Sequence, residues 1–176
     1  MKKKNFAKFI IIFLIFVVLI GSGLAAYFLF SEKNVSRGRD TQSEIINPAR
    51  DLSDEKALEQ FDENFVLYLL ASIGASRLHN PPLSSNTPKI EMFVSNDIYN
   101  AEINTGTISV RKSEIAKADI IIRTTKEEAI KMIRDKNYIA QSFREGESSI
   151  ELVESKTTLL AKGYLKIYNE LTGEKK

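Results

Sequence analysis

Few residues in this 176-residue chain have the type and spacing that acid–base, nucleophilic or metal chemistry needs. His79 is the only histidine, whereas a zinc site needs several such ligands together. It stands at the end of a predicted helix, where an imidazole can meet the terminal carbonyl groups, and this structural role is the expected one. The sequence therefore predicts no metal site.

The acid pairs and the serines beside them also have structural interpretations. Glu128 stands three residues after Thr125, in the spacing of a capping box, and Glu145 and Glu147 flank a predicted turn. Ser148 has no nearby base and no G-x-S-x-G elbow. The chain also has no cysteine and no glycine pattern for phosphate or dinucleotide binding. We therefore expect no catalytic residue, no cofactor and no enzymatic activity.

An uncharged hydrophobic segment, residues 9–30, dominates the N-terminal part of the chain. As a helix it would be about 33 Å long, enough to cross a hydrocarbon core of roughly 30 Å. Four of the first eight residues are lysines, so the positive-inside rule places residues 1–8 in the cytoplasm. The sequence thus predicts a single-pass protein of the cell membrane, with a transmembrane helix and an extracytoplasmic C-terminal domain.

A cleaved signal peptide is the alternative interpretation of the same segment. Gly23-Leu24-Ala25 has the small-x-small pattern of a cleavage site, and cleavage after Ala25 would remove the anchor. Hydrophobic residues continue beyond it, from Ala26 to Phe30, and this continuation favours an uncleaved anchor.

The remaining charge is nearly balanced. The chain has 25 basic and 23 acidic side chains, and four of the basic ones precede the hydrophobic segment. Acidic residues therefore slightly outnumber basic ones in the rest of the protein. Because no basic stripe remains to neutralise phosphates, nucleic acid is not an expected partner.

A polar linker, residues 31–53, is predicted to separate the anchor from a single domain, residues 54–172. Ser53 has the position of an N-cap for a helix of about 25 residues that ends near His79. Apolar residues recur in it every three or four positions, namely Leu58, Phe61, Phe65, Leu69 and Ile73.

From Lys89 the apolar period changes from 3.6 to 2, which predicts strands. Turn residues at Asn96-Asp97 and Asn104-Thr105-Gly106 separate three of them. Ala118–Thr124 is a fourth strand, and its three consecutive isoleucines indicate a central position in the sheet.

Two short helices then open at Thr125 and Tyr138, before a fifth strand near Ile150 and a last helix from about Lys156 to Leu171. The full order is α-β-β-β-β-α-α-β-α. It predicts an α+β domain in which helices cover a five-stranded, mostly antiparallel sheet.

Two short patterns stand out within this element order. The first is Ala118-Asp119-Ile120-Ile121-Ile122, followed by an acidic helix, and the second is Ser142-Phe143-Arg144-Glu145-Gly146, followed by a strand and the final helix. Together with the element order, they resemble the sterol carrier protein 2 family. The resemblance covers about residues 54–172.

The resemblance implies an apolar tunnel between sheet and helices that holds a lipid or other hydrophobic small molecule. Aromatic and aliphatic residues of the first and last helices and of the second short helix would line it: Phe61, Phe65, Leu69, Phe143, Leu160, Tyr164, Ile167 and Tyr168. The alternative is a ligand-free scaffold, in which the same side chains fill the space and the domain is the extracytoplasmic part of a membrane protein complex.

Overall fold

The computed structural model describes residues 45–174. The predicted cytoplasmic tail, transmembrane helix, cleavage site and most of the linker lie outside this range. Within the described range, none of the helices has the length and apolar character that crossing a membrane requires.

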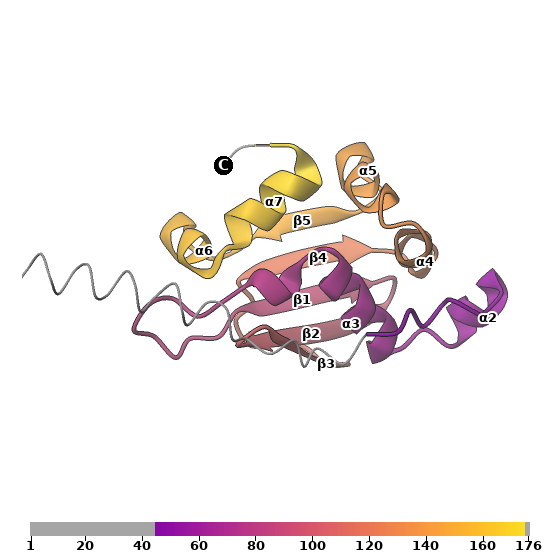
Figure 1. Ribbon diagram of the computed structural model, residues 1–176, viewed down its shortest axis with the longest axis horizontal. Coiled ribbons are helices and arrows are strands. Elements are labelled where there is room, and N and C mark those ends of the chain that lie inside the picture. The colour runs from indigo at the N-terminus through magenta and orange to yellow at the C-terminus, as the bar shows by residue number, and fades with distance from the viewer. Residues whose placement is uncertain (1–44, 175–176) are drawn as a thin grey trace, which may run out of the picture. The chain divides into compact units, whose positions relative to one another are not determined.

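Five strands form one mixed sheet in the order β3-β2-β1-β4-β5 (Figure 1). β1 and β4 are parallel, and the other three neighbouring pairs are antiparallel. The strands are β1 Lys89–Val94, β2 Asp97–Asn104, β3 Thr107–Arg111, β4 Ile120–Thr124 and β5 Ser149–Leu152. The α+β class and the five strands are therefore confirmed. β4 lies between β1 and β5 and is thus an interior strand, but the predicted central position belongs to β1, and β4 is buried mainly on one face.

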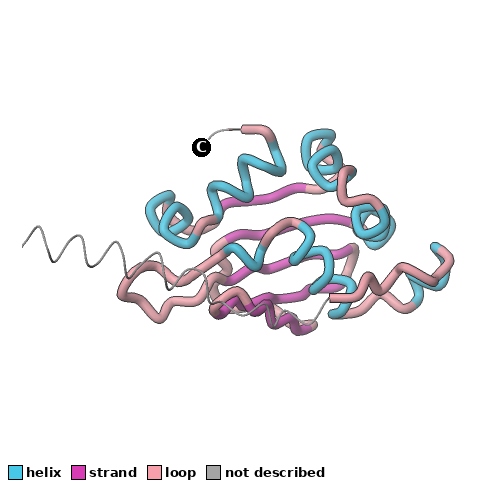
Figure 2. Tube along the Cα trace, viewed as in Figure 1, coloured by secondary structure: helices cyan, strands magenta, loops and turns pink. Residues whose placement is uncertain are grey.

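The helices lie over one face of this sheet and at its ends, with α3 and α7 in front of it in Figures 1 and 2. The order of helices and strands agrees with the prediction, although two predicted helices are divided. The helices are α2 Asp54–Glu59, α3 Glu63–Ser72, the 3₁₀ helix η1 Ala75–Arg77, α4 Lys126–Arg134, α5 Tyr138–Glu145, α6 Lys156–Lys162 and α7 Tyr164–Thr172.

Tight turns fix the register of the first three strands. Thr105 and Gly106 link Asn104 to its partner Thr107, and both have positive φ, 48° and 83°. This is the conformation of a type I′ hairpin turn, whose twist matches that of the strands.

The predicted long first helix is wrong, because it breaks into α2, α3 and η1. The Asp62 side chain accepts hydrogen bonds from the backbone N–H groups of Asn64 and Phe65, at 2.9 and 3.4 Å, and so starts a new helix. Gly74, with φ of 87°, ends α3 and precedes η1. The apolar periodicity is real, but a local cap and a left-handed glycine divide it.

The predicted continuous last helix is also wrong. Gly163 has φ of 88°, so the chain turns there from α6 into α7. A left-handed residue cannot continue a right-handed helix, and glycine adopts it without steric cost.

The folded part begins before the predicted domain boundary at residue 54. Ala49 is fully buried, and Asn47 donates a hydrogen bond to the carbonyl of Ile133 at 3.2 Å. Arg134 donates to the carbonyls of Ala49 and Leu52, at 3.2 and 2.7 Å. Residues 45–53 therefore pack on the end of α4 instead of belonging to a free linker.

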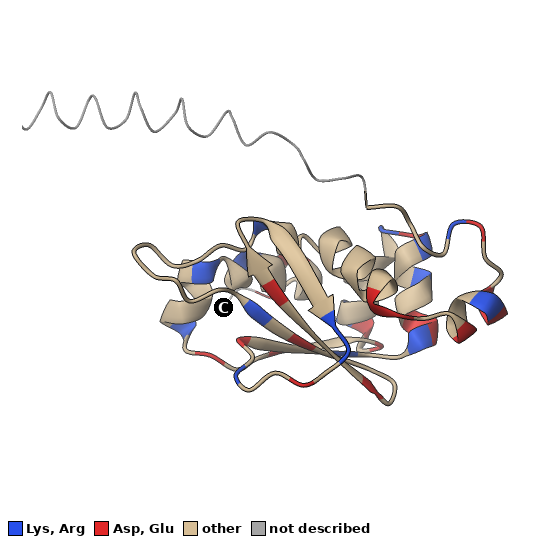
Figure 3. Cartoon of the chain, turned by 90° about the horizontal axis from the view of Figure 1, so that it is seen from below, with Lys and Arg blue, Asp and Glu red and all other residues tan. Residues whose placement is uncertain are grey.

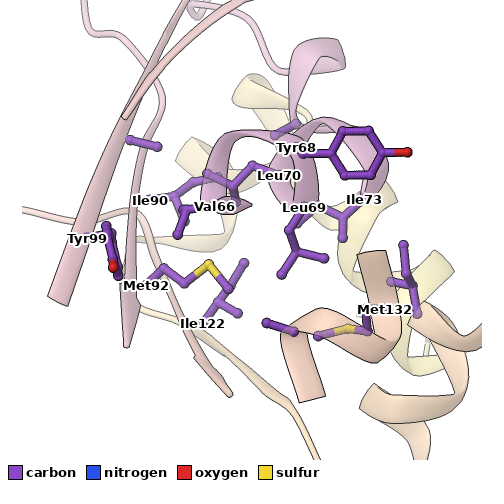
Figure 4. Close-up of a cluster of buried hydrophobic side chains, with 14 of the residues drawn as sticks. Val66, Tyr68, Leu69, Leu70, Ile73, Ile90, Met92, Tyr99, Ile122 and Met132 are labelled. Carbon is purple, nitrogen blue, oxygen red and sulfur yellow. The ribbon is translucent and has the colours of Figure 1, made fainter. Parts of the chain in front are cut away.

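The core lies between the helices and one face of the sheet. In register, Met92 pairs with Tyr99 on β2 and with Ile122 on β4, so these three side chains share that face. Figure 4 shows Met92 and Ile122 on the side of the sheet where Leu69 and Leu70 of α3 lie. We call the buried side chains between this face and the helices the apolar layer.

The surface around this core carries mixed charge. Basic and acidic residues are interspersed over the helices and loops in Figure 3. On the sheet face opposite the apolar layer, the Arg123 guanidinium lies 4.5 Å from the centre of the Phe93 ring.

Candidate ligand site in the apolar layer

Seven of the eight predicted tunnel residues are buried. They belong to helices α3, α5 and α7 and to the residue pair before α3: Phe61, Phe65, Leu69, Phe143, Tyr164, Ile167 and Tyr168. Leu160 is 67% exposed and does not lie with them. The turn at Gly163 removes α6 from the line of α7, so the helical spacing that grouped Leu160 with Tyr164 and Ile167 does not apply.

An aromatic cluster forms one end of the apolar layer. The ring centres of Phe61 and Phe65 are 5.0 Å apart, and that of Tyr99 is 6.4 Å from Phe61 in an edge-to-face arrangement. The cap at Asp62 positions this cluster, because it turns the chain between Phe61 and Phe65 and starts α3 there. Tyr99 enters it from β2 and is fully buried.

The Tyr99 hydroxyl has no hydrogen-bond partner among the described residues. Burying a hydroxyl without a partner costs about 1–3 kcal/mol. Burial raises the pKa of Tyr99, and the charge of Asp97 raises it further, so the phenol is neutral and can donate. A bound molecule with an acceptor oxygen would satisfy it.

Tyr99 was not among the predicted site residues. The sequence predicts that Tyr99 lies in a strand and shares its buried face with Ala101 and Ile103. This alternation indicates burial but no role in binding. The signal that could have identified it is the tyrosine itself, because a buried phenol requires a partner whereas its strand neighbours do not.

A second polar group, the Lys162 network, lies where the α6–α7 corner meets the sheet. Lys162 is fully buried, and its Nζ lies 2.8 and 2.9 Å from the two carboxylate oxygens of Asp119 and 3.0 Å from the Thr87 carbonyl. The Tyr164 hydroxyl donates to Asp119 Oδ2 at 2.9 Å and to the Lys89 carbonyl at 3.2 Å.

Each donor and acceptor in the Lys162 network is used. The Lys89 backbone N–H also donates to Asp119 Oδ2, at 2.7 Å, and the ammonium group has three acceptors. Burial and the neighbouring Asp119 charge raise the pKa of Tyr164 far above its usual value. A buried ion pair with complete hydrogen bonding fixes geometry, and here it holds the α6–α7 corner against Lys89, the first residue of β1, and Asp119, the residue before β4.

A third polar cluster joins α4, α5 and the start of β5. The Ser148 hydroxyl lies 2.8 Å from those of both Thr124 and Ser142. Glu128, close by, is buried, and its Oε2 accepts from Lys131 at 3.1 Å. Burial alone would raise the pKa of Glu128, but Tyr138, Ser142 and Lys131 together lower it. This cluster keeps a charged carboxylate at the first turn of α4, where the helix dipole favours it.

Two further predictions concern single residues. The Glu128 backbone N–H donates to Thr125 Oγ1 at 3.1 Å, which confirms the N-cap half of the predicted capping box, while Glu128 Oε2 accepts from Lys131. His79 is exposed, and its Nδ1 lies 3.3 Å from the carbonyl of Arg77, the last residue of η1. The described residues contain no group of three or more side chains that could hold a metal ion.

Comparisons with known proteins give likenesses of fold only. No family model and no curated protein matches the chain. Among solved structures, the chain is similar to the UbiJ-SCP2 ubiquinone synthesis protein, with 12% identity, a TM-score of 0.35 and coverage of 62% of this chain and 82% of that one. It is also similar to sterol carrier protein 2 like 2 from Aedes aegypti, with 11% identity, a TM-score of 0.35 and coverage of 64% and 97%.

A third similar structure is a double mutant of the sec-alkyl sulfatase PisA1, with 14% identity and a TM-score of 0.36. The match covers 55% of this chain but only 14% of the sulfatase chain. At such identities and scores, none of these structures indicates what this chain binds or does.

Proposed function

We propose that the chain is a membrane-anchored domain that binds a lipid or another hydrophobic molecule within the apolar layer. Binding requires no covalent step, because each Å² of apolar ligand surface removed from water contributes about 25 cal/mol. The protein is not an enzyme under this proposal. It takes up, holds or presents its ligand at the outer face of the membrane.

One observation carries the proposal: the fully buried hydroxyl of Tyr99, beside the rings of Phe61 and Phe65, has no hydrogen-bond partner in the described part of the chain. A binding site for a hydrophobic molecule combines apolar walls with a few polar groups that orient it. Phe61 and Phe65 supply apolar walls, and Tyr99 supplies a polar group that the fold does not use.

Membrane anchoring rests on the sequence of residues 9–30. The structure begins at Ile45, so residues 31–44 connect the proposed anchor to the folded part. A domain joined to a membrane anchor would exchange ligand with its own bilayer and would not travel to a distant one.

Native mass spectrometry of the full-length chain in mild detergent tests this function. We expect a retained lipid mass after addition of methyl palmitate, and a higher unfolding midpoint because the ligand binds only the folded state. Phe65→Ala should abolish retention, whereas Leu160→Ala, which changes an exposed side chain, should not. No retained mass and no shift of the midpoint, with this or any other lipid offered, would exclude the function.

The ligand-free scaffold is the second candidate, and it comes from a different class. The contact between Phe61 and Phe65 favours it. Their ring centres lie 5.0 Å apart, so the two rings fill part of the apolar layer themselves. A scaffold would bind no lipid in the experiment above, and it would instead co-purify with a membrane protein in fixed proportion.

A further inference from the structure

We infer that the polar group of the ligand is an uncharged acceptor oxygen, as in an ester, a ketone or an alcohol, which accepts a hydrogen bond from Tyr99. Carboxylate and phosphate heads are excluded from this position. The inference rests on the proposed function and specifies the chemical class of its ligand.

The first step concerns the donor. Tyr99 is fully buried, and its hydroxyl lacks a partner in the described part of the chain. Burial raises the pKa of this phenol, so it keeps its proton and offers one O–H. What it lacks is therefore an acceptor, which an ester carbonyl or an alcohol oxygen provides.

The second step concerns charge. Three carboxylates, those of Asp62, Glu63 and Asp97, act on the Tyr99 hydroxyl and raise its pKa, while Lys112 lowers it. The ammonium of Lys112 is already engaged, because it lies 2.8 Å from Asp97. Its Nζ lies 5.8 Å from the centre of the Tyr99 ring.

Asp97 also holds Lys126, whose Nζ lies 3.0 Å from Oδ2. Three acidic groups thus stand against two ammonium groups around this position, and both ammonium groups are paired with Asp97. An anionic head brought here would meet a negative field and would lose its hydration, so an uncharged head is favoured.

Photo-crosslinking tests the inference on the full-length chain in nanodiscs of a single zwitterionic phospholipid. Three probes share one 16-carbon chain with a diazirine near the head, and they differ only in ending as a carboxylic acid, a methyl ester or an alcohol. We expect the ester and the alcohol to label peptides that contain Phe61, Phe65 or Tyr99 at least 5-fold more than the acid does.

Tyr99→Phe should reduce labelling by the ester and the alcohol roughly 2- to 10-fold, the range expected for one lost hydrogen bond, and should leave the acid unchanged. Tyr68→Phe is the matched control, because its hydroxyl is directed away from the apolar layer (Figure 4). Its labelling should equal that of the wild type.

The outcomes separate this inference from the proposed function. Equal labelling by all three probes, or labelling by the ester that Tyr99→Phe does not change, overturns the inference and leaves lipid binding standing. Absence of labelling by every probe overturns the proposed function, and the inference fails with it.

Discussion

Two buried tyrosines in this domain have opposite surroundings. The hydroxyl of Tyr164 donates to Asp119 and to the Lys89 carbonyl, within the Lys162 network, whereas the hydroxyl of Tyr99 has no partner among the described residues. The same polar group is thus incorporated into the fold at one position and left unsatisfied at the other. The comparison separates two kinds of buried polar group. The Tyr164 hydroxyl stabilises this domain, whereas a contribution to stability does not explain why the Tyr99 hydroxyl is present.

The largest expected effect comes from removing the charge of Asp119. Asp119→Asn leaves the fully buried ammonium of Lys162 without a counter-charge, and we expect it to lower the free energy of unfolding by about 3–5 kcal/mol. Denaturant-induced unfolding, followed by circular dichroism, measures this change.

A double variant provides the control for Asp119→Asn. Adding Lys162→Met removes the buried charge as well, so the double variant should be more stable than the single one. A loss below about 1 kcal/mol for Asp119→Asn would mean that the Lys162 network does not hold the fold, and the contrast with Tyr99 would lose its basis.

The hydroxyl of Tyr164 should have the next largest effect. Tyr164→Phe removes a hydrogen bond to a carboxylate and should cost about 1.5–3 kcal/mol near neutral pH. The pKa of Tyr164 is raised in the folded state, while an unfolded tyrosine titrates near pH 10. Its contribution to stability is therefore complete below about pH 10 and is lost as the pH rises further.

Unfolding midpoints from pH 8 to 11 check this prediction. The wild type should lose stability above about pH 10 more steeply than Tyr164→Phe, and a residual slope from Tyr99, whose pKa is also raised, should remain in the variant. Identical slopes in the two proteins would contradict the assignment.

The α6–α7 corner should show a smaller effect. Gly163→Ala forces a residue with a Cβ into φ of 88°, at a cost of about 1–2 kcal/mol. The added Cβ would lie 3.5 Å from His79 Cε1, an ordinary contact, so the cost comes from the backbone. Gly163→Asn should cost less, because asparagine tolerates this conformation better, and thermal unfolding of both variants tests the ranking.

Strands and helix breaks differ in how far the sequence could predict them. The strands were predictable because the alternation around Met92, the apolar run at 120–122 and turn residues such as Gly106 are local signals. The breaks in the first and last helices were not, because the apolar period runs across Asp62 and Gly163 without interruption. Only the cap hydrogen bonds and the left-handed φ divide those helices.

The polar parts of the interior were harder to predict than the apolar ones. Apolar spacing predicts burial, and seven of the predicted tunnel residues are buried. Leu160 is exposed because α6 turns away from the direction of α7 at Gly163. Lys162 lies 43 residues from Asp119 in the chain, and only the folded structure brings them together. Whether Tyr99 has a partner likewise depends on contacts that sequence spacing does not contain.

The change with the smallest expected loss of stability, Tyr99→Phe, tests most directly whether the Tyr99 hydroxyl serves a ligand. In the ligand-free, full-length chain this variant should be at least as stable as the wild type, and more stable by up to about 1–3 kcal/mol, because it removes a buried hydroxyl that has no partner within residues 45–174.

The decisive measurement is the unfolding midpoint of the wild type and of Tyr99→Phe, each with and without methyl palmitate. We expect the ligand-free midpoint of the variant to be no lower than that of the wild type, and the ligand to raise the midpoint of the wild type more than that of the variant. A variant that loses more than about 1 kcal/mol without ligand, or an equal rise in both proteins, would contradict the claim that the Tyr99 hydroxyl serves the ligand and not the fold.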